Sequence, residues 1–145
     1  MNANVIMQLI DVSKTYAMGE VTVEALKKSS LEIFAGELVV ILGPSGSGKS
    51  TLLNIMGGMD LPTEGKVLFD GQDFSTADDN QLTLFRRNEV GFVFQFYNLI
   101  SDLTAAENVE MAAELVDSPL SVEECLKEVE LLERKDSFPS QLSGG

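Results

Sequence analysis

One stretch decides the fold of this 145-residue chain: Gly43-Pro44-Ser45-Gly46-Ser47-Gly48-Lys49-Ser50. It matches the pattern G-x-x-x-x-G-K-[ST], whose glycines let the backbone bend tightly so that successive N–H groups point at phosphate oxygens. The apolar run 38–42 before it predicts a buried parallel strand, and residues 49–56 after it predict a helix that stops at Gly57-Gly58. The alternative, an ordinary glycine-rich turn, does not account for strand, loop, Lys-Ser and helix following one another in this order.

The end of this loop carries the side chains that bind a nucleotide. The positive end of the following helix adds to the attraction of the loop amides for phosphate. Lys49 can reach the β- and γ-phosphates, and the Ser50 hydroxyl can take a position on Mg²⁺. The sequence therefore predicts a site for a nucleoside triphosphate with Mg²⁺.

The remaining strands and helices follow from composition and spacing. Strand-like runs rich in Val, Ile, Leu and Phe cover 5–12, 23–27, 30–34, 66–69 and 90–94, with turn signals at 35–37 and at Asp70-Gly71. Helices are expected at 80–87 and after the capping boxes Thr104 with Glu107 and Ser121 with Glu124. The last helix is expected to bury one face, formed by Val122, Leu126, Val129 and Leu132. The order indicates an α/β domain followed by a helical segment.

Composition excludes several classes of protein. Apolar residues make up 44% and charged residues 23%, as in globular domains and unlike disordered segments. No apolar run approaches the roughly 18 residues that a membrane helix needs, and the first ten residues lack the Lys or Arg of a secretory signal. A single Cys125, expected to be partly buried, excludes an internal disulfide. Histidine is absent, which excludes mechanisms that need an imidazole from this chain.

The net charge of −13 is unevenly distributed. Residues 59–145 hold 18 acidic and 6 basic side chains, and 102–136 alone hold 11 and 3. Because attraction to phosphates supplies most of the affinity for nucleic acid, this balance disfavours nucleic acid as a partner. We interpret the acidic stretch as a solvated helical surface.

Three further features narrow the class of nucleotide-binding protein. Tyr16 lies 27 residues before the loop, Gln95 follows the run 91–94, and the chain ends in Leu142-Ser143-Gly144-Gly145. With the loop, these features resemble the ATP-binding-cassette (ABC) nucleotide-binding domain, with its A-loop aromatic, Walker A motif, Q-loop and the start of the LSGGQ signature. Further stretches look most like the branch that contains the lipoprotein-releasing and macrolide-export ATPases; they include 57–60, 84–87, 90–99 and 103–109.

The resemblance covers the whole chain and implies an α/β, P-loop NTPase fold of the ABC ATPase type. It implies a single ABC-type domain over 1–145, with an antiparallel β subdomain and a parallel-sheet core in 1–97 and the start of the helical subdomain in 98–145. The family's later motifs, the Walker B Asp with its catalytic Glu and the switch His, are not in these residues. We therefore hypothesise that 1–145 is a C-terminally incomplete cassette, in which the run 38–42 loses strand neighbours and exposes apolar surface.

The resemblance also implies roles for individual residues. Tyr16 would stack on adenine, and its alternative is a half-buried strand aromatic. Gln95 would contact Mg²⁺ or the attacking water, and its alternative is a plain polar residue that ends an edge strand. The segment Asn98–Thr104 would contact a coupling helix of a transmembrane permease, and a generic surface loop is its alternative. The γ-phosphate held by a second, opposing cassette would be bound by Ser143, Gly144 and Gly145. The implied ATP contacts nearer the start of the chain are Gly43, Pro44, Ser45, Gly46, Ser47, Gly48, Lys49, Ser50 and Thr51, with Mg²⁺ on Ser50 and Gln95.

The function implied is that of the ATP-binding subunit of an ABC transporter on the cytoplasmic face of the cell membrane. This subunit, as a homodimer, would couple ATP binding and hydrolysis to transport or extraction of a lipoprotein or of a macrolide or peptide by the permease. Hydrolysis by residues 1–145 alone is expected to be slow, because loss of a general base typically costs about 10²–10⁴ in rate. Two alternatives remain open: a nucleotide-binding fragment without turnover, and a soluble ABC-type ATPase of DNA repair or translation.

Overall fold

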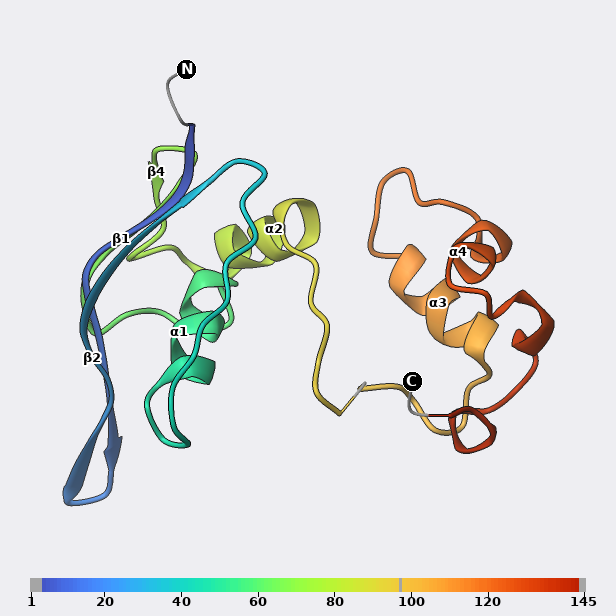
Figure 1. Cartoon of the computed structure of the whole chain (residues 1–145), viewed down its shortest axis with the longest axis horizontal. Helices are drawn as coiled ribbons and strands as arrows, with labels where there is room; N and C mark the ends of the chain where they lie inside the picture. The colour runs from blue at the N-terminus through green and yellow to red at the C-terminus, as the bar shows by residue number, and fades with distance from the viewer. Residues whose placement is uncertain (1–3, 97, 144–145) are drawn as a thin grey trace. The chain divides into compact units, whose positions relative to one another are not determined.

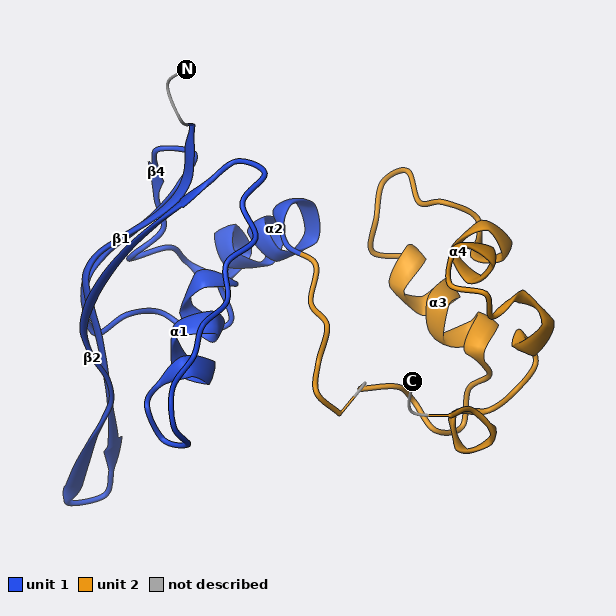
Figure 2. Ribbon diagram, viewed as in Figure 1, with its two compact units in different colours: residues 1–90 blue, residues 91–145 orange. Residues whose placement is uncertain are grey.

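The computed structural model describes residues 4–96 and 98–143. The chain forms two compact units, residues 1–90 and 91–145 (Figure 2). The expected division of the family's subdomains between residues 97 and 98 stays a prediction. Within the described ranges, no helix has the length and apolar content that crossing a membrane requires.

The first unit is built on an antiparallel sheet of four strands in the order β2-β1-β3-β4. β1 (Val5–Met18) and β2 (Val21–Phe34) form a long hairpin (Figure 1). β3 (Glu64–Phe69) pairs with the other edge of β1, and β4 (Gln72–Asp73) extends the sheet beyond β3. Two separate strands were predicted at 23–27 and 30–34, but both runs lie in the single strand β2. The chain does not turn between them, because bulges along the β1–β2 ladder absorb the shifts in register.

The core of this unit lies between the sheet and two helices. α1 (Lys49–Met56) and α2 (Asp79–Glu89) lie on the same side of the sheet (Figure 1). Phe85 of α2 packs edge-on against Phe69, with ring centroids 5.0 Å apart. The buried side chains of the core come from every strand except β4 and from both helices; they are Met7, Leu9, Val12, Leu26, Ile55, Val67 and Phe85.

Local signals predicted the helices of this unit well. α1 has the predicted bounds, and the Gly57 amide donates to the carbonyl of Leu53 as the helix ends. The following segment is held by Arg86, whose guanidinium donates to the Gly58 carbonyl at 2.5 Å. α2 is slightly longer than predicted, because Asp78 and Gln81 form a capping box at its start.

The prediction of a buried parallel strand at 38–42 is wrong for this structure. Leu38, Val40 and Leu42 are 89%, 69% and 86% exposed, while Val39 and Ile41 are half-buried. Among the described residues no segment pairs with this run, and a strand needs a neighbour to satisfy its N–H and C=O groups. The exposure of apolar surface expected for this run is therefore observed.

The strand predicted at 90–94 does not form either. Val90 is the extended residue that ends α2, and Gly91–Phe94 are irregular with Val93 fully exposed. Both runs belong to the expected parallel-sheet core, and the strand pairs among the described residues are antiparallel only.

The second unit consists of α3 (Ala105–Ala113) and α4 (Val122–Glu128) with two short 3₁₀ turns, Leu132–Arg134 and Pro139–Gln141. Both predicted capping boxes form, and the amide of Ala105 donates to the Ser137 carbonyl at 2.9 Å.

The predicted apolar face of the last helix is only partly correct. Leu126 is buried, but Val129 is 62% exposed, because α4 ends at Glu128. Cys125 is half-buried, as predicted.

Candidate nucleotide-binding site

The glycine-rich loop 43–48 leads directly into α1. Gly48 is the residue before the helix and has a φ of +88°, a conformation that glycine adopts without strain. Gly46 has a φ of +79°, so the loop turns twice through the left-handed region before Lys49 begins the helix. These two glycines are therefore required by the backbone path of the loop.

Gly48 also lets the loop lie against the sheet. A Cβ at this position would lie 2.7 Å from the carbonyl oxygen of Ala25 and 3.2 Å from Cδ1 of Leu26, both on β2. Within the loop, a Cβ at Gly43 would lie 2.6 Å from Oγ of Ser47. A side chain at Gly48 would push the loop away from β2, because the backbone of Ala25 cannot turn aside, whereas at Gly43 the Ser47 hydroxyl would have to rotate away.

Lys49 holds its ammonium group across the loop. Its Nζ donates to the carbonyl oxygens of Gly43 at 2.8 Å and Pro44 at 2.7 Å, and lies 3.5 Å from Oγ of Ser47. Within the described residues this ammonium has no carboxylate partner. A positive charge that lies over a glycine loop without an acidic partner is well placed to bind an anion.

The donor groups of the loop fit a chain of phosphates. The amides of Ser45, Gly46 and Gly48 have no hydrogen-bond acceptor within residues 4–96 and 98–143. No acidic residue occupies the first turn of α1, and the hydroxyl of Ser50 is exposed at that turn. The loop therefore offers N–H donors, one ammonium and a hydroxyl, which are the groups that hold phosphate with a magnesium ion. Groups of three or more acidic, Cys or His side chains that could hold a metal do not occur in the described parts of the chain.

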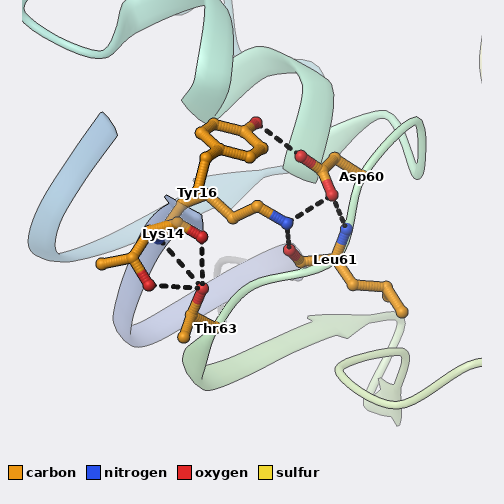
Figure 3. Close-up of polar contacts among 6 residues, drawn as sticks. Lys14, Tyr16, Asp60, Leu61 and Thr63 are labelled. Carbon is orange, nitrogen blue, oxygen red and sulfur yellow. Dashed lines mark hydrogen bonds and ion pairs between the residues drawn. The ribbon is translucent and has the colours of Figure 1, made fainter. Parts of the chain in front are cut away.

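Tyr16 lies on β1, near the strand residues that the loop touches. Lys14, two residues before Tyr16, pairs with Leu26, the residue that approaches Gly48. The Tyr16 hydroxyl donates to Oδ2 of Asp60 at 2.6 Å (Figure 3), and this hydrogen bond raises the pKa of Tyr16 above its ordinary value. The residue is 38% exposed, so part of the ring is open to a ligand.

Thr51 lies in the first turn of α1, and the predicted site residues after residue 90 belong to the second unit. Gln95 lies in an exposed turn after the irregular segment 91–94, rather than at the end of a strand. Ser143 is exposed and follows the 3₁₀ turn Pro139–Gln141. Gly144 and Gly145 lie outside the described residues.

One residue that shapes the predicted permease-contact segment 98–104 was not predicted from the sequence. The side chain of Asn108 on α3 accepts from the Ile100 amide at 2.8 Å and donates to the carbonyl oxygens of Ile100, Leu103 and Thr104 at 3.1, 3.1 and 2.9 Å. Asn108 belongs to the stretch 103–109, which carries part of the family resemblance. The spacing of residues in this stretch does not indicate that the side-chain amide of Asn108 binds the loop before α3. The roles of Lys14 and Asp60 beside Tyr16 were also missed, since Asp60 lies 44 positions after Tyr16 and only the fold brings it to Lys14 and Tyr16.

Comparison with known proteins gives consistent matches. The sequence profile described as "ABC transporter" matches residues 26–145. An uncharacterized ABC transporter ATP-binding protein of Thermotoga maritima is 50% identical over 145 residues, which is 97% of this chain and 62% of that protein. The macrolide export ATP-binding/permease protein MacB of Brucella abortus is 47% identical over 145 residues, or 97% of this chain and 22% of that protein.

A solved structure matches as well. The dimeric ATP-binding cassette of Methanocaldococcus jannaschii, in a post-hydrolysis state bound to ADP and Pi, has a TM-score of 0.85 at 47% identity, over 96% of this chain and 64% of that one. The chain thus spans less than two-thirds of the length of these relatives.

Proposed function

The chain belongs to the ABC transporter family and has the fold of an ATP-binding cassette, and on this premise we propose that it is the ATP-binding part of a transporter subunit. In this proposal it couples ATP binding and hydrolysis to transport or extraction of a substrate by a membrane permease. The single observation that carries the proposal is the geometry of the loop 43–48. Lys49 donates to the first two carbonyls of this loop, and the loop packs against β2 at Gly48.

Different residues of this chain would hold different parts of MgATP. The free loop amides bind phosphate oxygens, and the Lys49 ammonium neutralises their charge. The hydroxyls of Ser50 and Thr51 lie at the start of α1, where Ser50 would hold Mg²⁺ together with Gln95. Mg²⁺, when bound, offsets the negative charge that builds on the phosphates during transfer. The ring of Tyr16 stacks on the adenine.

A second cassette completes the site in this proposal. Ser143, with Gly144 and Gly145, would bind the γ-phosphate held by the partner, so that the working unit is a homodimer. The dimeric state of the Methanocaldococcus cassette supports this arrangement.

The segment 98–104 is the proposed contact with the permease. Leu99 and Ile100 are exposed apolar side chains on it, and Asn108 holds the backbone around them. The similarity to a macrolide export ATP-binding/permease protein supports an exporter. As its substrates we propose macrolides, peptides or lipoproteins, and we propose that this chain lies on the cytoplasmic side of the cell membrane.

The permease contact is tested by separating membranes of the host cell by flotation and measuring the chain recovered with them. We expect Leu99→Ser to lower the recovered fraction and Leu115→Ser, an equally simple change at another exposed leucine of the same unit, to leave it unchanged. Equal recovery of both variants and the wild type would count against a contact at 98–104.

The alternatives give different results in companion measurements on the same membranes. Phosphate release no faster than that of Lys49→Ala favours a nucleotide-binding fragment without turnover. Recovery away from membranes and with nucleic acid favours a soluble ABC-type ATPase. The proposed transporter subunit predicts phosphate release that depends on Lys49 and follows the membrane fraction.

A further inference from the structure

Asp60 links three groups beside the proposed adenine site. Its Oδ2 accepts from the Tyr16 hydroxyl at 2.6 Å, and its Oδ1 accepts from Nζ of Lys14 at 2.5 Å and from the Leu61 amide at 2.8 Å (Figure 3). Lys14 also donates to the Leu61 carbonyl at 2.6 Å. The side chains of Lys14 and Asp60 are only 13% and 27% exposed, so this pair is shielded from water more than a surface ion pair.

The same network fixes the aromatic ring of Tyr16. The Lys14 ammonium lies 5.0 Å from the ring centroid, which is the distance of a cation–π contact. An ammonium over a ring occupies one face, and the hydroxyl is tied at the ring's tip by Asp60. The ring is therefore held at its tip and contacted on one face by the ammonium, while the residue as a whole stays 38% exposed and within reach of a ligand.

Asp60 is at the same time attached to the helix that carries the phosphate-binding loop. Asp60 and Met59 donate their amides to the carbonyl of Asn54 in α1, at 3.3 and 2.8 Å. The chain that follows is tied to β1, because the Thr63 amide donates to the Ser13 carbonyl at 2.8 Å. Asp60 thus joins the end of α1, through its backbone amide, to the strand that bears Tyr16, through its carboxylate.

We propose that Asp60, together with Lys14, is a positioning residue that sets the Tyr16 ring for adenine relative to the phosphate-binding loop. This inference rests on the proposed function, since it needs Tyr16 to contact the base. A ring with a fixed tip loses less freedom when a base stacks on it, so the benefit appears in affinity for the base and not in affinity for the phosphates. Asp60 itself touches neither.

The first test compares binding of MgATP with binding of magnesium tripolyphosphate, which has phosphates but no base. We expect Asp60→Asn, which keeps the shape of the side chain, to weaken MgATP binding about 3- to 10-fold and to leave tripolyphosphate binding unchanged. Tyr16→Phe, which keeps the ring and removes the hydroxyl, should show the same loss. An equal loss for both ligands would mean that Asp60 acts on the loop or on the fold, and would overturn the proposal.

A double substitution separates positioning from a general structural effect. In a Tyr16→Ala background there is no ring to position, so adding Asp60→Asn should change MgATP affinity no further. A further loss of the same size would overturn the proposal. If the wild type binds neither MgATP nor tripolyphosphate, the proposed function itself fails, whereas normal binding by the wild type and by Asp60→Asn rejects this inference alone.

A spectroscopic readout tests the contact without any ligand. The chain has two tyrosines and no tryptophan, so Tyr97→Phe leaves Tyr16 as the single tyrosine. In that background the pKa of Tyr16, followed by the ultraviolet absorbance of tyrosinate, should lie above the ordinary value for tyrosine, because the hydroxyl donates to Asp60. Asp60→Asn should bring the pKa back toward the ordinary value. An unchanged titration would show that the hydroxyl is not held by this carboxylate.

Discussion

A side chain at Gly48 would lie 2.7 Å from the carbonyl oxygen of Ala25, so the phosphate-binding loop and strand β2 are in contact through a residue that has no side chain. The φ of +88° at Gly48 adds a second requirement for glycine. The loop is thereby positioned by the sheet at its last residue and by α1, which starts one residue later.

Substitution of this glycine tests the contact. We expect Gly48→Ala to lower the free energy of unfolding by more than about 2 kcal/mol, because it combines backbone strain with a collision. Gly36→Ala is the matched control: its φ is +77°, but a Cβ there would meet nothing within 4 Å, so only the strain of about 1 kcal/mol remains. Urea unfolding followed by circular dichroism measures both, and equal losses would contradict the contact.

The ion pair at Asp60 predicts a pH dependence. Burial alone would raise the pKa of Asp60, but hydrogen bonds from Lys14, Tyr16 and the Leu61 amide outweigh it and lower the pKa below its ordinary value. Because the folded pKa is lowered, the ionised carboxylate stabilises the folded state above about pH 4, the ordinary value, and this contribution is lost as pH falls through the folded pKa.

Asp60→Asn should therefore cost on the order of 1 kcal/mol of unfolding free energy at pH 7, and less at pH 3. Urea unfolding of the wild type and the variant at both pH values measures the difference. A cost that is the same at pH 3 as at pH 7 would show that the charge of Asp60 contributes nothing.

The helix caps of the second unit are a separate source of stability. Thr104 accepts the Glu107 amide at 3.3 Å, while the Glu107 carboxylate accepts the Thr104 amide at 2.7 Å. We expect Thr104→Ala to lower the free energy of unfolding by about 1 kcal/mol. Ser101→Ala, an exposed hydroxyl in the same loop outside a cap, should change it by less than about 0.5 kcal/mol. The two variants are compared by thermal and urea unfolding.

Asn108 should control the order of the proposed permease-contact segment. Asn108→Ala removes the partner of the Ile100 amide, so hydrogen exchange at Ile100 should become faster. Asn88→Ala, an exposed asparagine of the first unit, serves as the residue-matched control. Exchange at Ile100 that is unchanged in Asn108→Ala would contradict the hydrogen bonds described.

Local signals predicted much of this fold, and non-local pairing explains most errors. The bounds of α1 and the caps at Thr104 and Ser121 were predicted because the determining residues are within four positions of one another. The run 38–42 was wrongly predicted as a strand, because apolar composition does not reveal whether another segment lies beside it.

In the candidate site, too, local features were predicted and contacts between distant residues were not. The loop and Lys49 were evident from the sequence, since the motif is continuous and its chemistry is local. The hydrogen bond between Tyr16 and Asp60 joins residues 44 positions apart, and only the fold brings them together. Asn108 was missed for a related reason: a single amide side chain carries no sequence signal for a loop partner.

Isothermal calorimetry shows whether the loop 43–48 and Lys49 hold MgATP. We predict that the wild type binds MgATP and that Lys49→Ala weakens binding at least about tenfold, which corresponds to 1.4 kcal/mol. Lys66→Ala, an exposed lysine on β3 away from the loop, should bind as the wild type does. A folded wild type that gives no binding heat, or a Lys49→Ala variant that binds as tightly as Lys66→Ala, would contradict the proposed binding of MgATP by this loop.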